Sequence, residues 1–258
     1  GGLRPEYNGA QDYDFIFRCT EMAGKIVHIP RVLYHWRVHS ASTADNPASK
    51  LYAYEAGKKA IEGNLLRCGE EGTVTLRSDY GFYDVEYKLQ GTPLVSVLIP
   101  NKDQADTLRT CIESIRKKCA YPAFEILVIE NNSTEKATFS YYKELEAQGI
   151  RVLQYPKQGF NYSAINNFGV REAKGEYLLF LNNDMEVITP DFMEKMVSNL
   201  QRPQIGAVGA KLYYPDNTVQ HAGIILGIGG IAGHAFLGLG RGRSGYQHKA
   251  SLQMNVSA

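Results

Sequence analysis

The sequence has little net charge and no apolar run of membrane-spanning length. Its 28 lysines and arginines almost cancel its 27 aspartates and glutamates, which argues against a general electrostatic attraction to nucleic acid. The longest apolar stretches have the length of strands, because charged residues or glycines interrupt anything longer, so no transmembrane helix is predicted. With 258 residues, the chain can bury one large core or two ordinary ones.

Cysteine is scarce, and the four cysteines match no metal-ligand spacing. Cys111 and Cys119 fall in or at the end of one predicted helix, so free thiols are favoured over disulfides. Free thiols are typical of the cytoplasm, which is the compartment that we expect. No Cys–His or Ser–His arrangement suggests a catalytic nucleophile, and no internal repeat is visible.

From residue 93 onward, strand patterns alternate with helix patterns, which is typical of a parallel α/β sheet. The predicted strands are 95–99, 126–129, 152–155, 177–181 and 205–213. Helices are predicted between them, one with its apolar stripe at 108–115 and another at 161–173. We expect Ser133 and Thr189 to be N-caps, with Pro190 at the first helical position, and Gly149 and Gly175 to end helices. Beyond residue 213 the chain is glycine-rich and loop-like.

The first 67 residues have a separate character. They predict a helix at 12–22, a strand at 25–29 and an amphipathic helix at 50–67, with a polar-aromatic segment at 35–39. Residues 68–92 are expected to form a connector with short strand-like pieces.

Polar clusters follow three of the predicted strands. They are Asn101-Lys102-Asp103, Glu130-Asn131-Asn132 and Asn182-Asn183-Asp184. Because parallel strands deliver their carboxyl ends to one sheet edge, the clusters should converge there. Amides and carboxylates suit the base and ribose of a nucleotide, and an aspartate suits Mg²⁺ or Mn²⁺ shared with a pyrophosphate. The alternative is that each cluster is only turn chemistry, since Asn and Asp favour turns.

The segment 161–167 adds a fourth candidate element. Asn166 and Asn167 lie inside a predicted helix, although Asn favours caps and turns over helix interiors. Local disagreement of this kind is concentrated at functional sites. A helix start with an extended cap at Asn161 is the alternative.

The glycine-rich segment 227–232 superficially matches a dinucleotide fingerprint. That fingerprint needs an acidic residue about 20 positions further on, and no Asp or Glu follows Asp216, so we reject it. The surrounding loop carries basic side chains that could help to hold a phosphate or the acceptor substrate. The alternative is that they are only solvated surface charges. These side chains are His221, His234, Arg241, Arg243, His248 and Lys249.

Two candidates precede residue 60. Asp12 could be a general base and His39 a metal ligand. On spacing alone, the structural explanations are favoured: Asp12 as a carboxylate that complements a helix dipole, and His39 as a structural histidine.

Taken in their order along the chain, the polar strand ends and the segment 161–169 resemble motifs of the inverting family 2 glycosyltransferases. Members of that family have the GT-A fold, a Rossmann-like, mostly parallel sheet flanked by helices. The resemblance covers residues 95–258 densely and rests on 93–100, 125–133, 161–169 and 181–184. Segments 213–216 and 220–223 are similar to the tandem bacterial members that build surface polysaccharides of the cell wall.

The resemblance implies roles for individual residues. It places nucleotide contacts on Pro100, Lys102, Glu130, Asn131 and Asn183, with Asn161, Asn166 and Asn167 supporting the ribose or sugar. Its metal aspartate falls on Asp184, its base on Asp12, and a histidine completing the metal site on His39. Asn182 replaces the first acid of the family's Asp-x-Asp, and Glu130 and Asn131 stand where Asp is commoner. The full predicted substrate-binding set is Pro100, Asn101, Lys102, Asp103, Glu130, Asn131, Asn161, Asn166, Asn167, Asn182 and Asn183.

The order of the segments predicts parts of two tandem domains. Residues 1–67 resemble the C-terminal part of one such domain, 68–92 a connector, and 93–258 the N-terminal, nucleotide-sugar-binding part of the next. The chain would then be a fragment across the join of the two domains, and both activity and inactivity of the isolated fragment stay open. A sharper hypothesis pairs the two halves, with Asp12 and His39 against Asp184.

The function implied is metal-assisted transfer, with inversion, of a hexosyl or rhamnosyl group from a nucleotide-diphosphate sugar to a glycan or lipid-linked acceptor. Peripheral association with the inner face of the membrane is the accompanying expectation, and nucleic acid is not expected as a partner. A nucleotidyltransferase is disfavoured because 101–104 contains no glycine. A non-catalytic module that binds nucleotide sugar or glycan is the other alternative.

Overall fold

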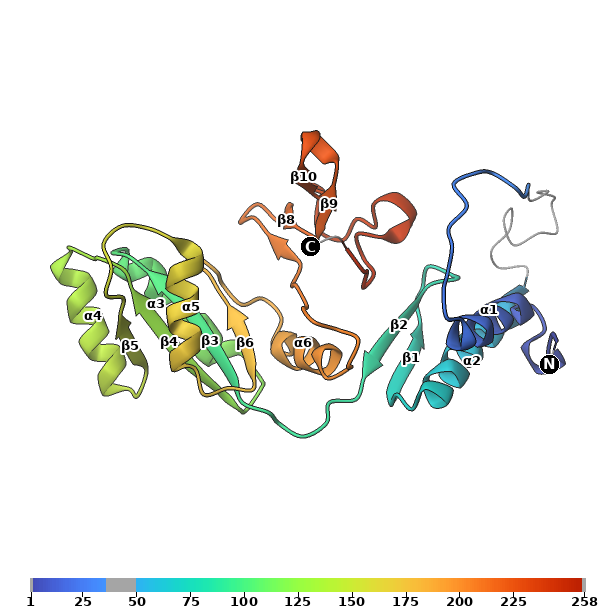
Figure 1. Ribbon diagram of the computed structural model, residues 1–258, viewed down its shortest axis with the longest axis horizontal. Helices are drawn as coiled ribbons and strands as arrows, with labels where there is room; N and C mark the ends of the chain where they lie inside the picture. The colour runs from blue at the N-terminus through green and yellow to red at the C-terminus, as the bar shows by residue number, and fades with distance from the viewer. Residues whose placement is uncertain (1, 36–49, 257–258) are drawn as a thin grey trace. The chain divides into compact units, whose positions relative to one another are not determined.

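The computed structural model describes residues 2–35 and 50–256 of the chain (Figure 1). The chain divides into two compact units, one formed by residues 1–88 with 209–258 and the other by residues 89–208. Among the described residues, no helix combines the length and apolar character needed to cross a membrane.

The unit 89–208 is built on a four-stranded parallel sheet with the order β5-β4-β3-β6 (Figure 1). The strands are β3 (Val95–Asn101), β4 (Phe124–Glu130), β5 (Arg151–Gln154) and β6 (Tyr177–Phe180). The helices are α3 (Ala105–Lys118), α4 (Lys136–Ala147), α5 (Tyr162–Glu172) and α6 (Phe192–Leu200). The expected α/β class, a parallel sheet flanked by helices, is confirmed.

Both faces of this sheet are covered, which explains why β3 is apolar at successive positions. On one face, Val97 and Ile99 pack with residues of α3, α4 and α6. On the other face, Leu98 and Ile129 pack with Ile165 of α5. Each fully buried aliphatic side chain contributes roughly 1.5–3 kcal/mol to folding, so these two layers hold the strand ends in a fixed arrangement.

Several expected boundaries in this unit are corrected. Ser133 is not the N-cap of α4, because that position is taken by Glu135 and the Ser133 side chain bonds elsewhere. The α6 helix begins two residues later than expected, with Asp191 as N-cap in place of Thr189. Gly149, with φ of +81°, follows the end of α4 as predicted. Gly175 does not end α5, whose C-cap is Ala173.

Gly175 is needed for a close approach to the sheet. A Cβ there would lie 2.5 Å from the backbone nitrogen of Ser96 and 2.8 Å from the carbonyl oxygen of Leu94. Its own amide donates to Ser96 Oγ at 2.8 Å. The glycine therefore admits the chain to the start of β6, beside β3.

In the other unit, the described residues among 1–88 contribute one short 3-10 helix, two α-helices and a hairpin. They are η1 (Pro5–Tyr7), α1 (Gln11–Met22), α2 (Leu51–Cys68), β1 (Gly72–Leu76) and β2 (Tyr83–Tyr87). Both predicted helices are confirmed, and the strand-like pieces of the expected connector pair as the antiparallel β1–β2 hairpin. Ile61 and Leu65 of α2 pack on Val74 of this hairpin. The predicted strand at 25–29 is wrong, because that segment pairs with no strand in the part of the chain that the structure describes, and Ile26 is 72% exposed.

The last fifty residues form short elements joined by glycines. They are β7 (Leu212–Tyr213), β8 (Val219–His221), β9 (Ile224–Leu226), η3 (Ile228–Gly230), β10 (Ala232–His234) and η4 (Tyr246–His248). The predicted strand 205–213 is therefore wrong except for its last two residues. Residues 205–211 contain four glycine or alanine positions, which offer little side chain for packing.

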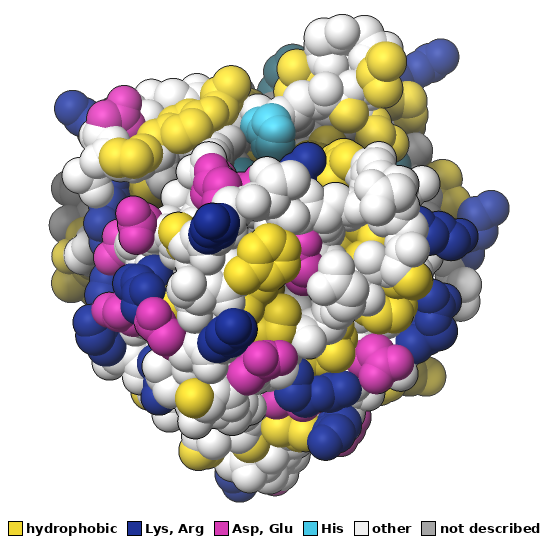
Figure 2. All heavy atoms as spheres, turned by 90° about the vertical axis from the view of Figure 1, so that its left-hand side faces the viewer, with side chains coloured by type: hydrophobic (Ala, Val, Ile, Leu, Met, Phe, Trp, Pro, Cys, Tyr) yellow, Lys and Arg dark blue, Asp and Glu magenta, His cyan; other side chains and the backbone are white. Residues whose placement is uncertain are grey.

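The face of the molecule seen in Figure 2 carries lysine and arginine side chains mixed with aspartate and glutamate. This mixture agrees with the net charge of +1.

Candidate functional site

The ends of three neighbouring strands meet at one edge of the sheet. Asn101 at the end of β3 pairs in register with Glu130 at the end of β4. The amide of Asn131 donates to the carbonyl oxygen of Asn101 at 2.8 Å. From the loop after β6, Asn183 Nδ2 donates to Asn101 Oδ1 at 2.7 Å. The predicted convergence of the three polar clusters is confirmed by these contacts.

Asn101 is the link between the clusters. Its side chain is 3% exposed, and its Nδ2 donates to the carbonyl oxygen of Asp103 at 2.9 Å and to Tyr142 Oη at 2.7 Å. Its Oδ1 accepts the bond from Asn183. Both ends of the amide are therefore used inside the protein, which fixes its orientation.

Glu130 is buried at the same edge, 1% exposed. Its carboxylate accepts bonds of 2.5 Å from the backbone amide of Ser133, from Ser133 Oγ and from Tyr142 Oη. A buried carboxylate is tolerated when charge-assisted bonds of this kind satisfy it. Burial raises the pKa of Tyr142, and its bond to Glu130 raises it further, so the phenol stays protonated and donates.

Sequence reasoning missed the roles of Ser133 and Tyr142. Ser133 was expected to cap α4, and Tyr142 has the spacing of an ordinary apolar core residue on that helix. The sequence does carry one signal: a glutamate at the end of a buried strand needs a buried hydrogen-bond donor for its carboxylate. That signal does not identify the residue that donates.

Asp103 ties the loop after β3 to the turn before α4. Its Oδ1 accepts from the backbone amides of Thr134 at 2.7 Å and Glu135 at 2.9 Å. Its own amide donates to Ser133 Oγ at 2.8 Å. The amides of Glu135 and then Thr134 lower the pKa of Asp103. Asp103 has φ of +53°, a left-handed conformation that Asp tolerates better than most residues.

The other predicted binding residues are more accessible. Pro100 is half-buried at the end of β3, beside the exposed Lys102. The exposed members of the set are Lys102, Asn161, Asn167, Asn182 and Asp184.

The N-terminus of α5 lies at this edge too. Asn161 caps the helix, its Oδ1 accepting from the amide of Ala164 at 3.0 Å. Tyr162, which sequence reasoning did not single out, donates from its hydroxyl to Asn182 Oδ1 at 3.5 Å. Asn166 is 5% exposed and donates to the carbonyl oxygen of Tyr162 at 2.9 Å, while its Oδ1 is buried without a partner. That orphaned oxygen fits the expectation of a functional asparagine in this helix.

The donor set suits a hard divalent cation that is shared with a ligand. Asp184 is an exposed carboxylate next to the amides of Asn182 and Asn183. Mg²⁺ is commonly held by one or two carboxylates plus phosphate oxygens. Across residues 2–35 and 50–256, no three His, Cys, Asp or Glu side chains are grouped so as to hold a metal. His39, the predicted histidine ligand, lies outside the described residues.

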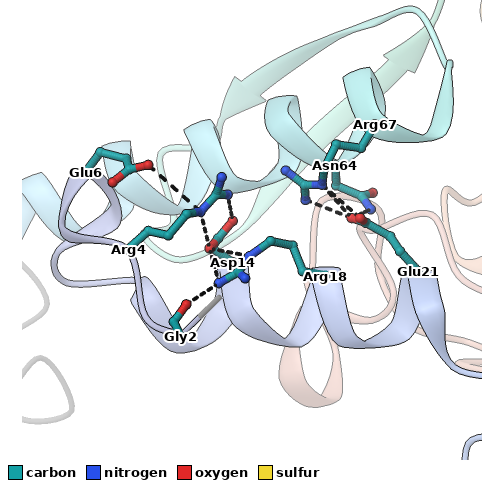
Figure 3. A network of polar contacts seen from close by, with 8 residues as sticks. All are labelled: Gly2, Arg4, Glu6, Asp14, Arg18, Glu21, Asn64 and Arg67. Carbon is teal, nitrogen blue, oxygen red and sulfur yellow. Dashed lines mark hydrogen bonds and ion pairs between the residues drawn. The ribbon is translucent and has the colours of Figure 1, made fainter.

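Asp12 lies in the other compact unit, in the first turn of α1, the helix that also carries Asp14 of the polar network in Figure 3. Asp12 is exposed, and its Oδ1 accepts from the amide of Tyr13 at 2.9 Å. Asp14, two residues further along α1, is fully buried. Its carboxylate accepts hydrogen bonds from the guanidinium groups of Arg4 and Arg18. The bond from Arg4, followed by that from Arg18, lowers the pKa of Asp14 against the opposing effect of burial.

The histidines of the glycine-rich region form a pair. His221 Nδ1 and His234 Nδ1 lie 2.8 Å apart, joining the end of β8 to the end of β10. Burial lowers the pKa of His221, and the nearby His234 lowers it further. Arg241 donates to Asn217 Oδ1 at 3.3 Å. A role of this region in holding phosphate or acceptor stays a prediction.

Open α/β sheets bind their ligands at the carboxyl ends of the strands, where this sheet gathers amides and one exposed aspartate. The sequence matches the family model described as "Glycosyl transferase family 2" over residues 96–231, more than half of the chain. The chain belongs to glycosyl transferase family 2, as the sequence motifs predicted.

Two curated relatives cover nearly the whole chain. "Uncharacterized protein y4gI" of Sinorhizobium fredii is 42% identical over 263 aligned positions, which is 100% of this chain and 29% of the relative. "O-antigen biosynthesis protein RfbC" of Myxococcus xanthus is 44% identical over 242 positions, 94% of this chain and 19% of the relative. The chain thus spans less than a third of the length of either relative.

Among solved structures, the mannosyltransferase PcManGT of Pyrobaculum calidifontis, in complex with GDP-Man and Mn²⁺, is similar to this chain. The TM-score is 0.43 and the identity 19%, with 65% of this chain and 46% of that chain covered.

Proposed function

We propose that this chain contributes a donor-binding site to a glycosyltransferase that builds a surface polysaccharide. The donor would be a nucleotide-diphosphate sugar, and the acceptor a glycan or a lipid-linked glycan. Family membership supports the reaction class, and the O-antigen relative supports the pathway class. The observation that carries the proposal is the bonded edge Glu130–Asn101–Asn183 with the exposed carboxylate of Asp184 beside it.

The chain's residues divide into two groups at this edge. Asn101, Asp103 and Glu130 use their polar atoms inside the protein, so in this proposal they shape the loops that surround the base. Asn131 has its amide bonded to Asn101 and its Oδ1 bonded by Asn132, and it would shape the same rim. Lys102, exposed beside Pro100, would place its ammonium on the donor.

Phosphate and sugar would be held on the other side of the edge. Asn161, Asn166 and Asn167, in and before the first turns of α5, would contact the ribose or sugar, and the positive end of the helix dipole points the same way. A divalent cation on Asp184 would neutralise the charge that develops on the leaving diphosphate. Asn182 and Asn183 would orient that carboxylate and the phosphate oxygens.

Transfer with inversion needs a carboxylate that deprotonates the acceptor hydroxyl. Asp12, which is exposed in the first turn of α1, is the carboxylate proposed for this role. In the tandem account, residues 1–67 and 93–258 belong to successive domains, and each domain of the full protein has its own base. We propose a hexosyl or rhamnosyl donor and a cytoplasmic site at the inner face of the membrane.

The test is calorimetric titration of the 258-residue chain with UDP, GDP and dTDP, each with and without MnCl₂. We expect one nucleotide to bind and Mn²⁺ to strengthen its binding. Asp184→Asn should remove the strengthening by Mn²⁺, while Glu194→Gln, which neutralises an exposed carboxylate on α6, should not. Nucleotide binding that ignores both Mn²⁺ and Asp184→Asn would favour a non-catalytic binding module instead.

A further inference from the structure

The loop that carries Asp184 is attached to α3 at several points. Ser114 Oγ accepts from the backbone amide of Val187 at 3.0 Å. Cys111 Sγ donates to the carbonyl oxygen of Asn182 at 3.7 Å, a weak bond. Lys118 Nζ donates to the carbonyl oxygen of Val187 at 2.8 Å. Positions 111, 114 and 118 are three and four residues apart, so they share one face of the helix.

The same loop is held from its other side by the sheet. Asn183 bonds to the buried Asn101 at the end of β3. Asp184 therefore follows two attached residues, Asn182 and Asn183, and precedes a third, Val187. Among the described residues, Asp184 itself has no hydrogen-bond or ion-pair partner. The position of its backbone is thus restrained by the attached residues on either side of it.

We propose that Ser114 is a positioning residue for Asp184: its buried hydroxyl on α3 holds the loop so that the carboxylate meets a divalent cation and a nucleoside diphosphate. The inference rests on the proposed function, in which Asp184 binds that cation. A carboxylate whose backbone is already held in position loses less conformational entropy when it binds a cation. A displacement of about an ångström would weaken its interaction with that cation. Lys118 supports the same loop from the surface.

A hydroxyl on a helix can be satisfied without such a link, and Ser198 shows this. Ser198 on α6 is 6% exposed, like Ser114. Its Oγ donates to the carbonyl oxygen three residues back, Lys195, at 3.1 Å. Ser114 makes the equivalent bond to Cys111 at 2.8 Å and accepts the Val187 amide in addition. The extra bond is the one that a loop-positioning role requires.

The two serines are a matched pair for the test. Ser114→Ala and Ser198→Ala each remove one buried hydroxyl with the same local bond, and only Ser114→Ala also removes a bond to the Asp184 loop. The readout is the dissociation constant of Mn²⁺, followed by its electron paramagnetic resonance signal in the presence of UDP, or of GDP if UDP does not bind. Losing one hydrogen bond to the loop should weaken Mn²⁺ binding about twofold to tenfold in Ser114→Ala. Ser198→Ala should bind Mn²⁺ like the unmodified chain.

Two further variants keep the test decisive. Lys118→Met acts at a half-exposed side chain, where folding is not at risk, and should weaken Mn²⁺ binding in the same direction. Ser114→Thr retains the hydroxyl and should restore much of the affinity.

The pattern of results separates the two proposals. If Asp184→Asn abolishes Mn²⁺ binding while Ser114→Ala and Lys118→Met leave it unchanged, the positioning role is wrong and the metal role stands. If Asp184→Asn has no effect, both proposals fail.

Discussion

Asn183 and Asn101, 82 positions apart, share a hydrogen bond of 2.7 Å from Nδ2 to Oδ1. This bond ties the loop after β6 to the end of β3, so the metal-binding candidate and the buried edge of the site move together. It is also the direct link between Asp184 and the network of Asn101, Tyr142 and Glu130.

The Asn101–Asn183 bond should appear as a coupling energy. Asn101→Ala should destabilise the chain more than Asn183→Ala, because it also leaves Tyr142 and Asp103 without a donor. Residues in direct contact couple by roughly 0.5–3 kcal/mol, and we expect about 1 kcal/mol here. Urea unfolding of both single variants and the double variant measures it. Strict additivity of the two substitutions would show that the bond contributes nothing.

The hydroxyl of Tyr142 should matter far more than that of its neighbour. Tyr142→Phe removes a donor to Glu130 and an acceptor for Asn101, and an unsatisfied buried group costs about 1–3 kcal/mol. Tyr141 is equally buried, but its ring contact is with Arg109, which needs no hydroxyl. Tyr141→Phe should therefore be nearly neutral in thermal unfolding. Equal losses in the two variants would mean that Glu130 does not depend on Tyr142.

Asp14 should make the unit 1–88 with 209–258 sensitive to acid. The guanidinium of Arg4 lowers the pKa of Asp14, so the ion pair contributes fully above the unfolded-state pKa of about 3.9. That contribution is lost as the pH falls through the lower, folded-state value. Asp14→Asn leaves two guanidinium groups without their carboxylate and should lower the free energy of unfolding by about 2 kcal/mol at pH 7. This loss is smaller than that for a fully buried ion pair, because Arg4 is one-third exposed.

The measurement is the free energy of unfolding between pH 2 and pH 7. The decrease towards low pH should be shallower in Asp14→Asn than in the unmodified chain. Glu71→Gln is the control, since the Glu71–Lys88 pair is exposed and such pairs contribute about 0–1 kcal/mol. If the free energy of unfolding decreases towards low pH equally in Asp14→Asn and in the unmodified chain, Asp14 has the same pKa in the folded and the unfolded state, and the prediction is wrong.

Two glycines at the sheet should respond differently to alanine. At Gly169 the new Cβ would lie 2.4 Å from Ile129 Cδ1, the end of a flexible side chain. Overpacking there costs about 1–3 kcal/mol, and the better helix propensity of Ala returns about 0.8–1 kcal/mol. At Gly175 the new Cβ would meet two backbone atoms that cannot move aside, the nitrogen of Ser96 in β3 and the carbonyl oxygen of Leu94 just before β3. Gly175→Ala should therefore lower the unfolding midpoint in urea more than Gly169→Ala, and the reverse order would disprove the close approach.

The sequence predicted most of the sheet unit, because burial on both faces leaves continuous apolar strands and helical stripes of fixed period. Prediction from the sequence failed where the outcome depended on which residues lie nearby in the folded chain. Ser133 has the chemistry of a helix cap but bonds to Glu130 and Asp103. Residues 25–29 have strand-like composition, yet strand formation needs a neighbour to pair with, and none is present among the described residues.

The candidate site divides in the same way. That three polar clusters would meet could be predicted, because the connections of a parallel sheet bring all carboxyl ends to one edge. Which polar atoms point inward could not be predicted. Glu130 and Asp103 have the composition of ligand-binding residues, but their oxygens are used by Tyr142, Ser133 and backbone amides.

The sequence by itself determined the α/β class, because that class depends on local periodicity and connectivity, and its motifs determined the family by their resemblance to known members. The tertiary structure alone decided which side chains satisfy one another and which stay available to a ligand. That distinction depends on contacts between residues far apart in the chain, such as Asn101 with Asn183 and Ser114 with Val187, whose distances no local pattern encodes.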